Sequence, residues 1–89
     1  PTEWKECDDT VTIDIDRKRL LIYSNPLQII RLLEFNGKEV DEYGITRLEW
    51  LGIDQDNETC LITLAANASY IILIRTYEEM EFWHNLEPS

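Results

Sequence analysis

The stretch from Cys60 to Tyr77 most strongly constrains what this chain can fold into. Its sequence is CLITLAANASYIILIRTY, and Arg75 is its only charged residue. Two runs rich in Ile, Leu, Thr and Tyr flank Ala-Asn-Ala-Ser, a pattern typical of a strand, a tight turn and a second strand. Because both runs carry apolar side chains on both faces, they predict strands in the middle of a sheet that is covered twice. The side chains that we expect to be largely buried are Leu61, Ile62, Leu64, Ile71, Ile72 and Leu73.

Two other regions have the alternation of half-buried strands. In residues 11–16 (VTIDID) every second side chain is apolar, and Arg17-Lys18 fits a turn before the apolar run at 19–24. This region predicts a hairpin with one solvent-facing side. Residues 46–54 (TRLEWLGID) predict a further strand.

One segment fits both a helix and a strand. The sequence SNP at 24–26 offers a cap and places Pro26 at a first helical position, and the apolar run LQIIRLLEF follows. We favour a short helix over residues 26–33. The alternative is a strand that turns at Asn36-Gly37, which is the strongest two-residue hairpin signal.

The end of the chain is ambiguous in the same way. Thr76 is followed three residues later by Glu79, which is a capping-box pattern and predicts a short C-terminal helix. The alternative is a bulged continuation of the preceding strand through Phe82.

These elements predict an α+β fold. We expect a single domain over residues 1–89, with a mostly antiparallel sheet of five or six strands and one or two short helices. Residues 1–9 contain four acidic residues, one Lys and one large apolar side chain, Trp4. We expect them to form a mobile arm, or an edge segment held by Trp4.

The charge limits the kind of partner. Eighteen Asp and Glu against eight Lys and Arg give a net charge of −10. Such a chain repels nucleic acid and anionic membranes, so we expect neither as a direct partner. The expected partner is a basic protein surface or the basic cleft of a nucleic-acid enzyme. The sequence does not predict the oligomeric state.

The cysteines and the hydropathy pattern bear on the compartment. Cys7 and Cys60 are too few for a disulfide scaffold, and we expect Cys60 to be a reduced, buried thiol. No apolar run reaches eighteen residues, and no signal-peptide pattern is present. We expect a soluble, cytoplasmic protein.

No motif in the sequence predicts catalysis. Residues 54–58 (DQDNE) space three carboxylates as a calcium loop begins, but Thr59 stands where the turn glycine belongs and Ala65 where the bidentate glutamate belongs. We interpret this segment as a polar turn. His84 is the only histidine, and no nucleophile motif accompanies it. We therefore expect no enzymatic activity, no catalytic residue, no metal site and no cofactor.

Acidic and aromatic side chains combine near the C-terminus, and this combination gives the functional hypothesis. Trp is a favoured interface anchor, and neighbouring acids steer association towards a basic surface. The residues that we predict to bind a partner are Glu78, Glu79, Glu81, Phe82 and Trp83. The alternative is that Phe82 and Trp83 close the edge of the core.

The function that we favour from the sequence is a stoichiometric inhibitor, of the kind that neutralises a toxin nuclease or a defence enzyme. The first alternative is a structural or assembly subunit that uses an apolar surface. The second is a small-ligand binder or an enzyme whose pocket the sequence does not reveal.

Overall fold

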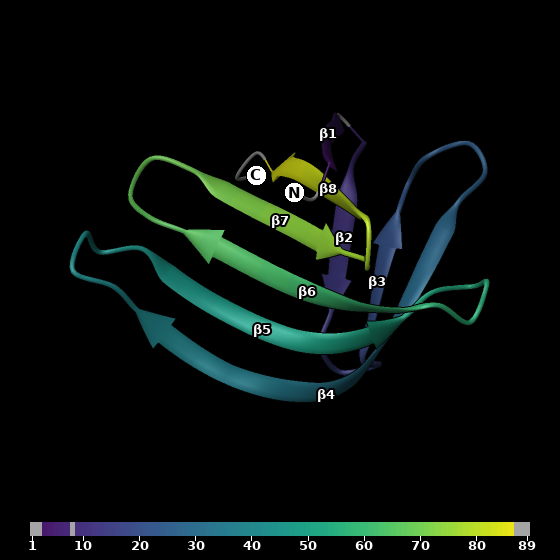
Figure 1. Cartoon of the computed structure of the whole chain (residues 1–89), viewed down its shortest axis with the longest axis horizontal. Coiled ribbons are helices and arrows are strands. Elements are labelled where there is room, and N and C mark those ends of the chain that lie inside the picture. Colours follow the sequence, from purple (N-terminus) through teal and green to yellow (C-terminus); the bar gives the residue numbers. More distant parts are fainter. Residues whose placement is uncertain (1–2, 8, 87–89) are drawn as a thin grey trace.

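The computed structural model describes residues 3–7 and 9–86, with side chains described from Asp9 onward. This part of the chain is built from strands and turns and contains no helix (Figure 1). Nor does it contain a helix that could cross a membrane. The strands are β1 (Glu3–Cys7), β2 (Val11–Asp14), β3 (Arg19–Ile22), β4 (Gln28–Val40), β5 (Thr46–Ile53), β6 (Thr59–Ala66), β7 (Ile71–Thr76) and β8 (Met80–Leu86).

The strands form one curled sheet in the order β1-β8-β7-β6-β5-β4-β3-β2. Strands β2 to β8 follow one another as an antiparallel meander, and β1 adds to β8 in the parallel direction. The edge strands β1 and β2 are separated by residues 8–10 alone, so the sheet must curl back towards itself. Figure 1 shows the resulting half-barrel, with β2 and β3 steeply inclined to the layer of β4 to β7.

The core lies on the concave side of this half-barrel. Its fully buried members come from β3, β4, β6 and β7, and they are Leu20, Ile22, Ile30, Leu32, Cys60, Ile62 and Leu73. Gly52 of β5 lies opposite Leu32, where a Cβ atom would stand 3.0 Å from Ile30 Cγ2 and 3.2 Å from Ile62 Cγ1. Glycine therefore lets β5 approach the core more closely than a larger residue would.

The predicted two-sided burial of the central hairpin is only partly right. Ile62 and Leu73 are fully buried, whereas Leu64, Ile71 and Ile72 are half-buried. Leu61 is 38% exposed, so its predicted burial is wrong. Leu61 and Ile72 point to the convex face, because successive side chains of a strand point to opposite faces and one layer of sheet buries only its concave face fully. Leu64 and Ile71 share the concave face with Ile62 and Leu73 but lie nearer the β6–β7 turn on their respective strands.

The expected α+β class is wrong, because most of the segment predicted as a helix over residues 26–33 belongs to β4, which begins at Gln28. The predicted number of five or six strands is also wrong, since the described residues form a sheet of eight. The Ser24 hydroxyl donates to the Pro26 carbonyl oxygen at 2.8 Å and accepts from Gln28 Nε2 at 3.1 Å, so it makes no helix cap. The β4 backbone pairs instead with β3 and, from Arg31, with β5. These sheet hydrogen bonds override the local helix signal.

The alternative interpretation, a strand that turns at Asn36-Gly37, is right about the strand and wrong about the turn. Gly37, with a φ of +136°, follows one of two register shifts at which β4 bulges against β5, and the strand continues to Val40. The chain reverses at Asp41 instead, where Asp41 Oδ1 accepts from the backbone nitrogens of Tyr43 and Ile45. This carboxylate, and not Asn36-Gly37, therefore organises the turn between β4 and β5.

The predicted C-terminal helix is wrong, and so is the alternative of a continued strand. Tyr77 N donates to Met80 O at 2.8 Å, and this turn sends the chain back as β8. The Thr76 hydroxyl, expected to cap a helix, donates to Glu81 Oε2 on the neighbouring strand.

Other sequence predictions are confirmed. The hairpin in residues 11–24 is formed by β2 and β3, the strand in 46–54 is β5, and the central hairpin is β6 and β7. Residues 54–58 form the polar turn, closed by a hydrogen bond from Asp54 N to Glu58 O at 3.0 Å. Cys60 is free and buried, as predicted. Residues 3–7 form the edge strand β1, and the predictions for residues 1, 2 and 8 lie outside the described chain.

Candidate binding pocket

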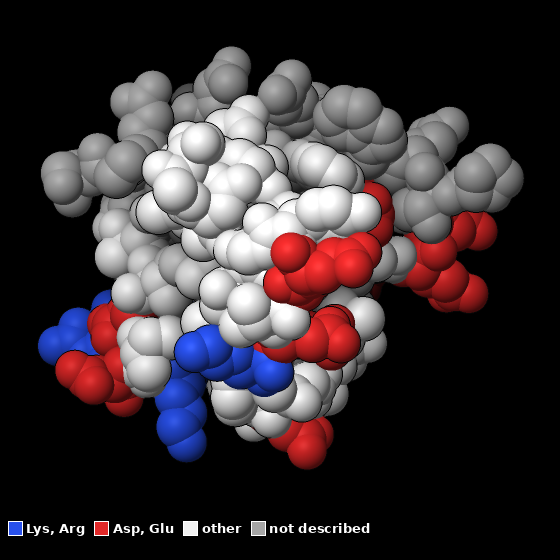
Figure 2. Space-filling view, turned by 90° about the vertical axis from the view of Figure 1, so that its left-hand side faces the viewer, with Lys and Arg blue, Asp and Glu red and all other residues white. Residues whose placement is uncertain are grey.

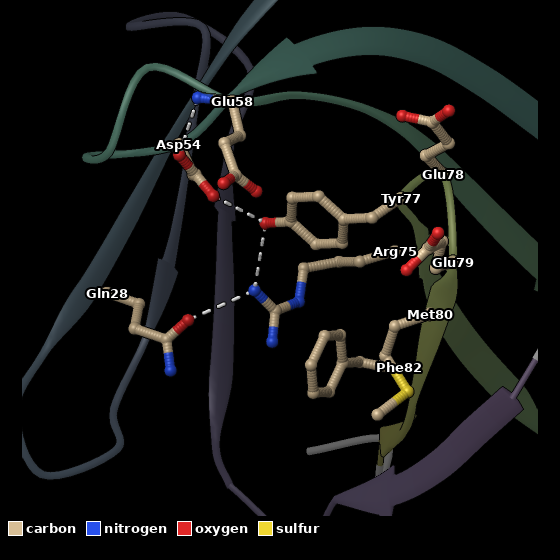
Figure 3. Close-up of a pocket in the computed structure, with 9 residues that line it drawn as sticks. All are labelled: Gln28, Asp54, Glu58, Arg75, Tyr77, Glu78, Glu79, Met80 and Phe82. Atoms are coloured by element: carbon tan, nitrogen blue, oxygen red, sulfur yellow. Dashed lines mark hydrogen bonds between the residues drawn. The ribbon is translucent and has the colours of Figure 1, made fainter.

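A pocket of about 620 Å³ opens at one end of the half-barrel. The β5–β6 loop and the β7–β8 turn approach the start of β4 there, and together they supply its walls. The lining residues are Gln28, Asp54, Glu58, Arg75, Tyr77, Glu78, Glu79, Met80 and Phe82 (Figure 3). This volume lies within the range of small-molecule and side-chain binding sites.

Arg75 forms the floor of the pocket. It is only 4% exposed, and it projects from the concave face of β7. Its Nε donates to His84 Nε2 at 3.1 Å, and its Nη1 donates to Gln28 Oε1 at 3.0 Å. The guanidinium carbon lies 4.5 Å from the centre of the Phe82 ring, which is a cation–π contact. No carboxylate of the described residues forms a direct ion pair with this buried charge.

Tyr77 connects Arg75 to a carboxylate. Its hydroxyl donates to Asp54 Oδ2 at 2.9 Å and accepts a long, 3.5 Å contact from Arg75 Nη1. Asp54 Oδ1 accepts from the backbone nitrogens of Asp56 and Glu58, so the polar turn holds this carboxylate in place. Burial and the hydrogen bond to Asp54 raise the pKa of Tyr77, which keeps the phenol protonated.

His84 lies beneath Arg75 and is completely buried. Because Nε2 accepts a hydrogen bond from Arg75, the neutral imidazole carries its proton on Nδ1. Burial, and secondly the charge of Arg75, lower the pKa of His84 to about 4. The Nδ1 atom has no hydrogen-bond partner within the described part of the chain.

The mouth of the pocket is acidic. Glu58, Glu78 and Glu79 are exposed, and none of them forms an ion pair with another described residue. With Asp54, the lining contains four carboxylates against the one guanidinium of Arg75. The pocket therefore has a negative rim above a single, deeply placed positive charge.

The opposite end of the molecule has a different charge arrangement. Figure 2 shows this end, where basic side chains lie next to acidic ones below an uncharged surface. In the turn after β4, Arg47 Nη1 donates to Asp41 Oδ2 at 2.9 Å, and this hydrogen bond lowers the pKa of Asp41. The carboxylates at the pocket mouth have no such partner among the described residues.

The structure divides the predicted partner-binding residues into two groups. Glu78, Glu79 and Phe82 line the pocket. Glu81 and Trp83 lie on the other face of β8, where Trp83 Nε1 donates to Glu81 Oε1 at 3.2 Å. Side chains alternate along a strand, so adjacent residues that seem to form one cluster in the sequence face opposite ways.

Sequence reasoning missed the interior of the pocket. The sequence patterns predict a core strand for Arg75 and Tyr77, a turn for Asp54 and a helix for Gln28. One signal was present: Arg75 is the only charged residue in an apolar run, and buried charges of this kind often mark functional sites.

The chemical state of His84 and Cys60 limits what these two buried residues can do. The acceptor nitrogen of His84 is taken by Arg75, and burial raises the pKa of the Cys60 thiol. These two residues therefore lack the properties of a base and an activated nucleophile. Among the described residues, no cluster of His, Cys, Asp and Glu is able to hold a metal ion.

A second hollow of about 500 Å³ lies between the β2–β3 turn and the bulged part of β4. Its walls are mostly apolar, and they are formed by Ile15, Lys18, Leu32, Leu33, Glu34, Phe35, Leu48 and Trp50. Phe35 is 54% exposed and contacts Trp50 with 5.4 Å between the ring centres. We call this hollow the apolar groove.

Comparisons with protein-family models, with curated proteins and with solved structures give no match. The function is therefore argued from the geometry and charge of the site.

Proposed function

We propose that this protein is a non-enzymatic binding module that recognises a basic site on another protein through the acidic pocket. The observation that carries the proposal is a set of three carboxylates at the mouth that form no ion pair with any described residue, Glu58, Glu78 and Glu79. A Lys or Arg side chain of the partner would place its charge among these carboxylates and its aliphatic stem against Met80 and Phe82.

The overall charge supports the same proposal. A net charge of −10 attracts a basic partner over long range, and the pocket then provides a defined place for one of its cationic groups. Where the partner's basic site is an active-site cleft, occupying it would block that cleft. Stoichiometric inhibition is the form of the function that we propose for such a partner. A direct contribution of Glu81 and Trp83 to binding stays a prediction.

Cys60 supports the proposed cytoplasmic location. A buried free thiol is typical of proteins in a reducing compartment.

The proposal is tested with an amidated, lysine-rich nonapeptide as the probe and isothermal titration calorimetry as the measurement. Glu78→Gln with Glu79→Gln should weaken binding about fivefold or more at low salt, and the difference should shrink near 1 M salt, where the Debye length is about 3 Å. The matched control is Glu39→Gln with Glu42→Gln, which removes the same charge from exposed positions at the opposite end. Equal losses from both pairs would show that net charge alone, rather than the pocket, governs binding.

The apolar groove favours a second candidate, an assembly subunit. Leu33 and Phe35 are 49% and 54% exposed beside Trp50, and the three line one apolar hollow of the kind that marks interaction sites. Assembly through this groove would be insensitive to salt and lost on Phe35→Ser. Sedimentation measures the oligomeric state of the unaltered chain and of this variant at low and high salt. This measurement distinguishes assembly through the groove from binding in the pocket.

A further inference from the structure

One nitrogen of the buried guanidinium has no acceptor. Arg75 uses Nε and Nη1 in its hydrogen bonds, whereas Nη2 makes none with the described residues. Figure 3 shows this nitrogen directed into the space between Gln28 and Phe82. Arg75 as a whole is 4% exposed, but Nη2 is not among the buried nitrogens that lack a partner, so this atom is open to the pocket. A charged donor that faces a pocket and has no acceptor among the described residues is suited to bind an oxygen ligand, so we expect the floor of the pocket to bind one.

The two charges of the pocket restrict what this ligand can be. A simple anion would be repelled at the mouth by Glu58, Glu78 and Glu79 before it reached Arg75. A simple cation would satisfy the mouth but leave Arg75 Nη2 unpaired. A ligand with a carboxylate at one end and a cation at the other can pair with Arg75 at the floor and with the glutamates at the mouth.

We propose that the pocket binds the C-terminal residue of a basic partner chain, and that this residue is Lys or Arg. Its terminal carboxylate would accept from Arg75 Nη2, and its side-chain cation would lie between Glu78 and Glu79. Capture of a chain terminus is an established mode of peptide recognition. The inference rests on the proposed function, since it names the group that the same pocket recognises.

The test uses three acetylated hexapeptides that differ only at their C-terminus. The first ends in Lys with a free carboxylate, the second in Lys amide, and the third in Gln with a free carboxylate. In calorimetric titrations at low salt, the first should bind at least about tenfold more tightly than either of the others, because each lacks one of the two charges.

The outcomes distinguish this inference from the proposed function. If the Lys acid and Lys amide peptides bind equally, and Glu78→Gln with Glu79→Gln weakens both, the pocket binds cations and terminal recognition is overturned. If no peptide binds, both proposals fail. Tight binding of the Gln acid peptide, equal to that of the Lys acid peptide, would also overturn the inference.

Arg75→Met provides the test on the protein side, because it removes every donor of the guanidinium. In the folded variant, verified by circular dichroism, the advantage of the Lys acid over the Lys amide should vanish. An advantage that persists would exclude Arg75 as the carboxylate ligand. Arg75 is buried, so a variant that does not fold is set aside, and the acid-against-amide comparison on the unaltered protein decides the question independently.

Discussion

The interior of the half-barrel has two regions of opposite character. Along β3, β4 and β6 the concave face is filled by aliphatic side chains such as Leu20, Ile30 and Ile62. At the end where β7 turns into β8, Arg75 and His84 replace them, equally buried and hydrogen-bonded to each other. Apolar packing stabilises the fold without regard to direction, whereas hydrogen bonds at the polar end require particular partners at particular distances.

This difference teaches where stability and function are located. The apolar region supplies transfer energy that scales with buried area. The polar end costs desolvation energy, which its hydrogen bonds offset, and it holds the charged groups that line the pocket. The two regions should therefore respond differently to mutation and to pH.

The largest effect should come from damage to the apolar region. Ile62→Ala removes a fully buried side chain and should lower the free energy of unfolding by about 2–5 kcal/mol. The matched control is Leu61→Ala on the same strand, where the side chain is 38% exposed and the loss should be much smaller. Urea denaturation midpoints measure both. Equal losses would mean that the convex face is covered as well as the concave one.

The second-largest effect on stability should come from protonating His84 at the polar end. The pKa of His84 is about 4 in the folded chain against about 6.5 when unfolded, so between these values the unfolded state binds more protons. The contribution of neutral His84 to the free energy of unfolding is fully present above pH 6.5 and is lost as the pH falls towards 4. The loss should be on the order of 3 kcal/mol.

Urea denaturation between pH 7 and pH 4 measures this loss. His84 is the only histidine, so His84→Gln should flatten the dependence in that window. If the free energy of unfolding depends on pH equally steeply in the variant, titrating groups other than His84 cause the loss.

The smallest effect should come from removing one hydroxyl at the polar end. Tyr77→Phe deprives Asp54 Oδ2 of its donor and should cost about 1–2 kcal/mol. Tyr43→Phe serves as the control, because Tyr43 is 79% exposed and its hydroxyl makes no hydrogen bond with the described residues. Thermal unfolding compares the two variants. If they are equally stable, the Tyr77–Asp54 bond contributes nothing beyond what water would provide.

Local patterns in the sequence determined much of the sheet. The strands β2, β3, β5, β6 and β7 follow from alternation and turn residues, because a strand with one solvent-facing side leaves a period of two in its own sequence. Burial of Ile62 and Leu73 and the free, buried thiol of Cys60 follow from the same patterns. So does the polar turn at 54–58, whose side chains bond to their own backbone.

Only the tertiary structure decided the rest. A cap and an apolar run in residues 24–33 favour a helix locally, but pairing with β3 and β5 makes this segment β4. Such pairing depends on residues far along the chain, and no local pattern contains it. The site could not be predicted from local patterns for the same reason. Its residues come from four separate regions of the sequence and meet because the sheet curls; they include Gln28, Asp54, Arg75 and His84. The sequence alone determined that the chain is acidic and that Arg75 is an isolated charge, while curvature of the sheet placed that charge at the floor of an acidic pocket.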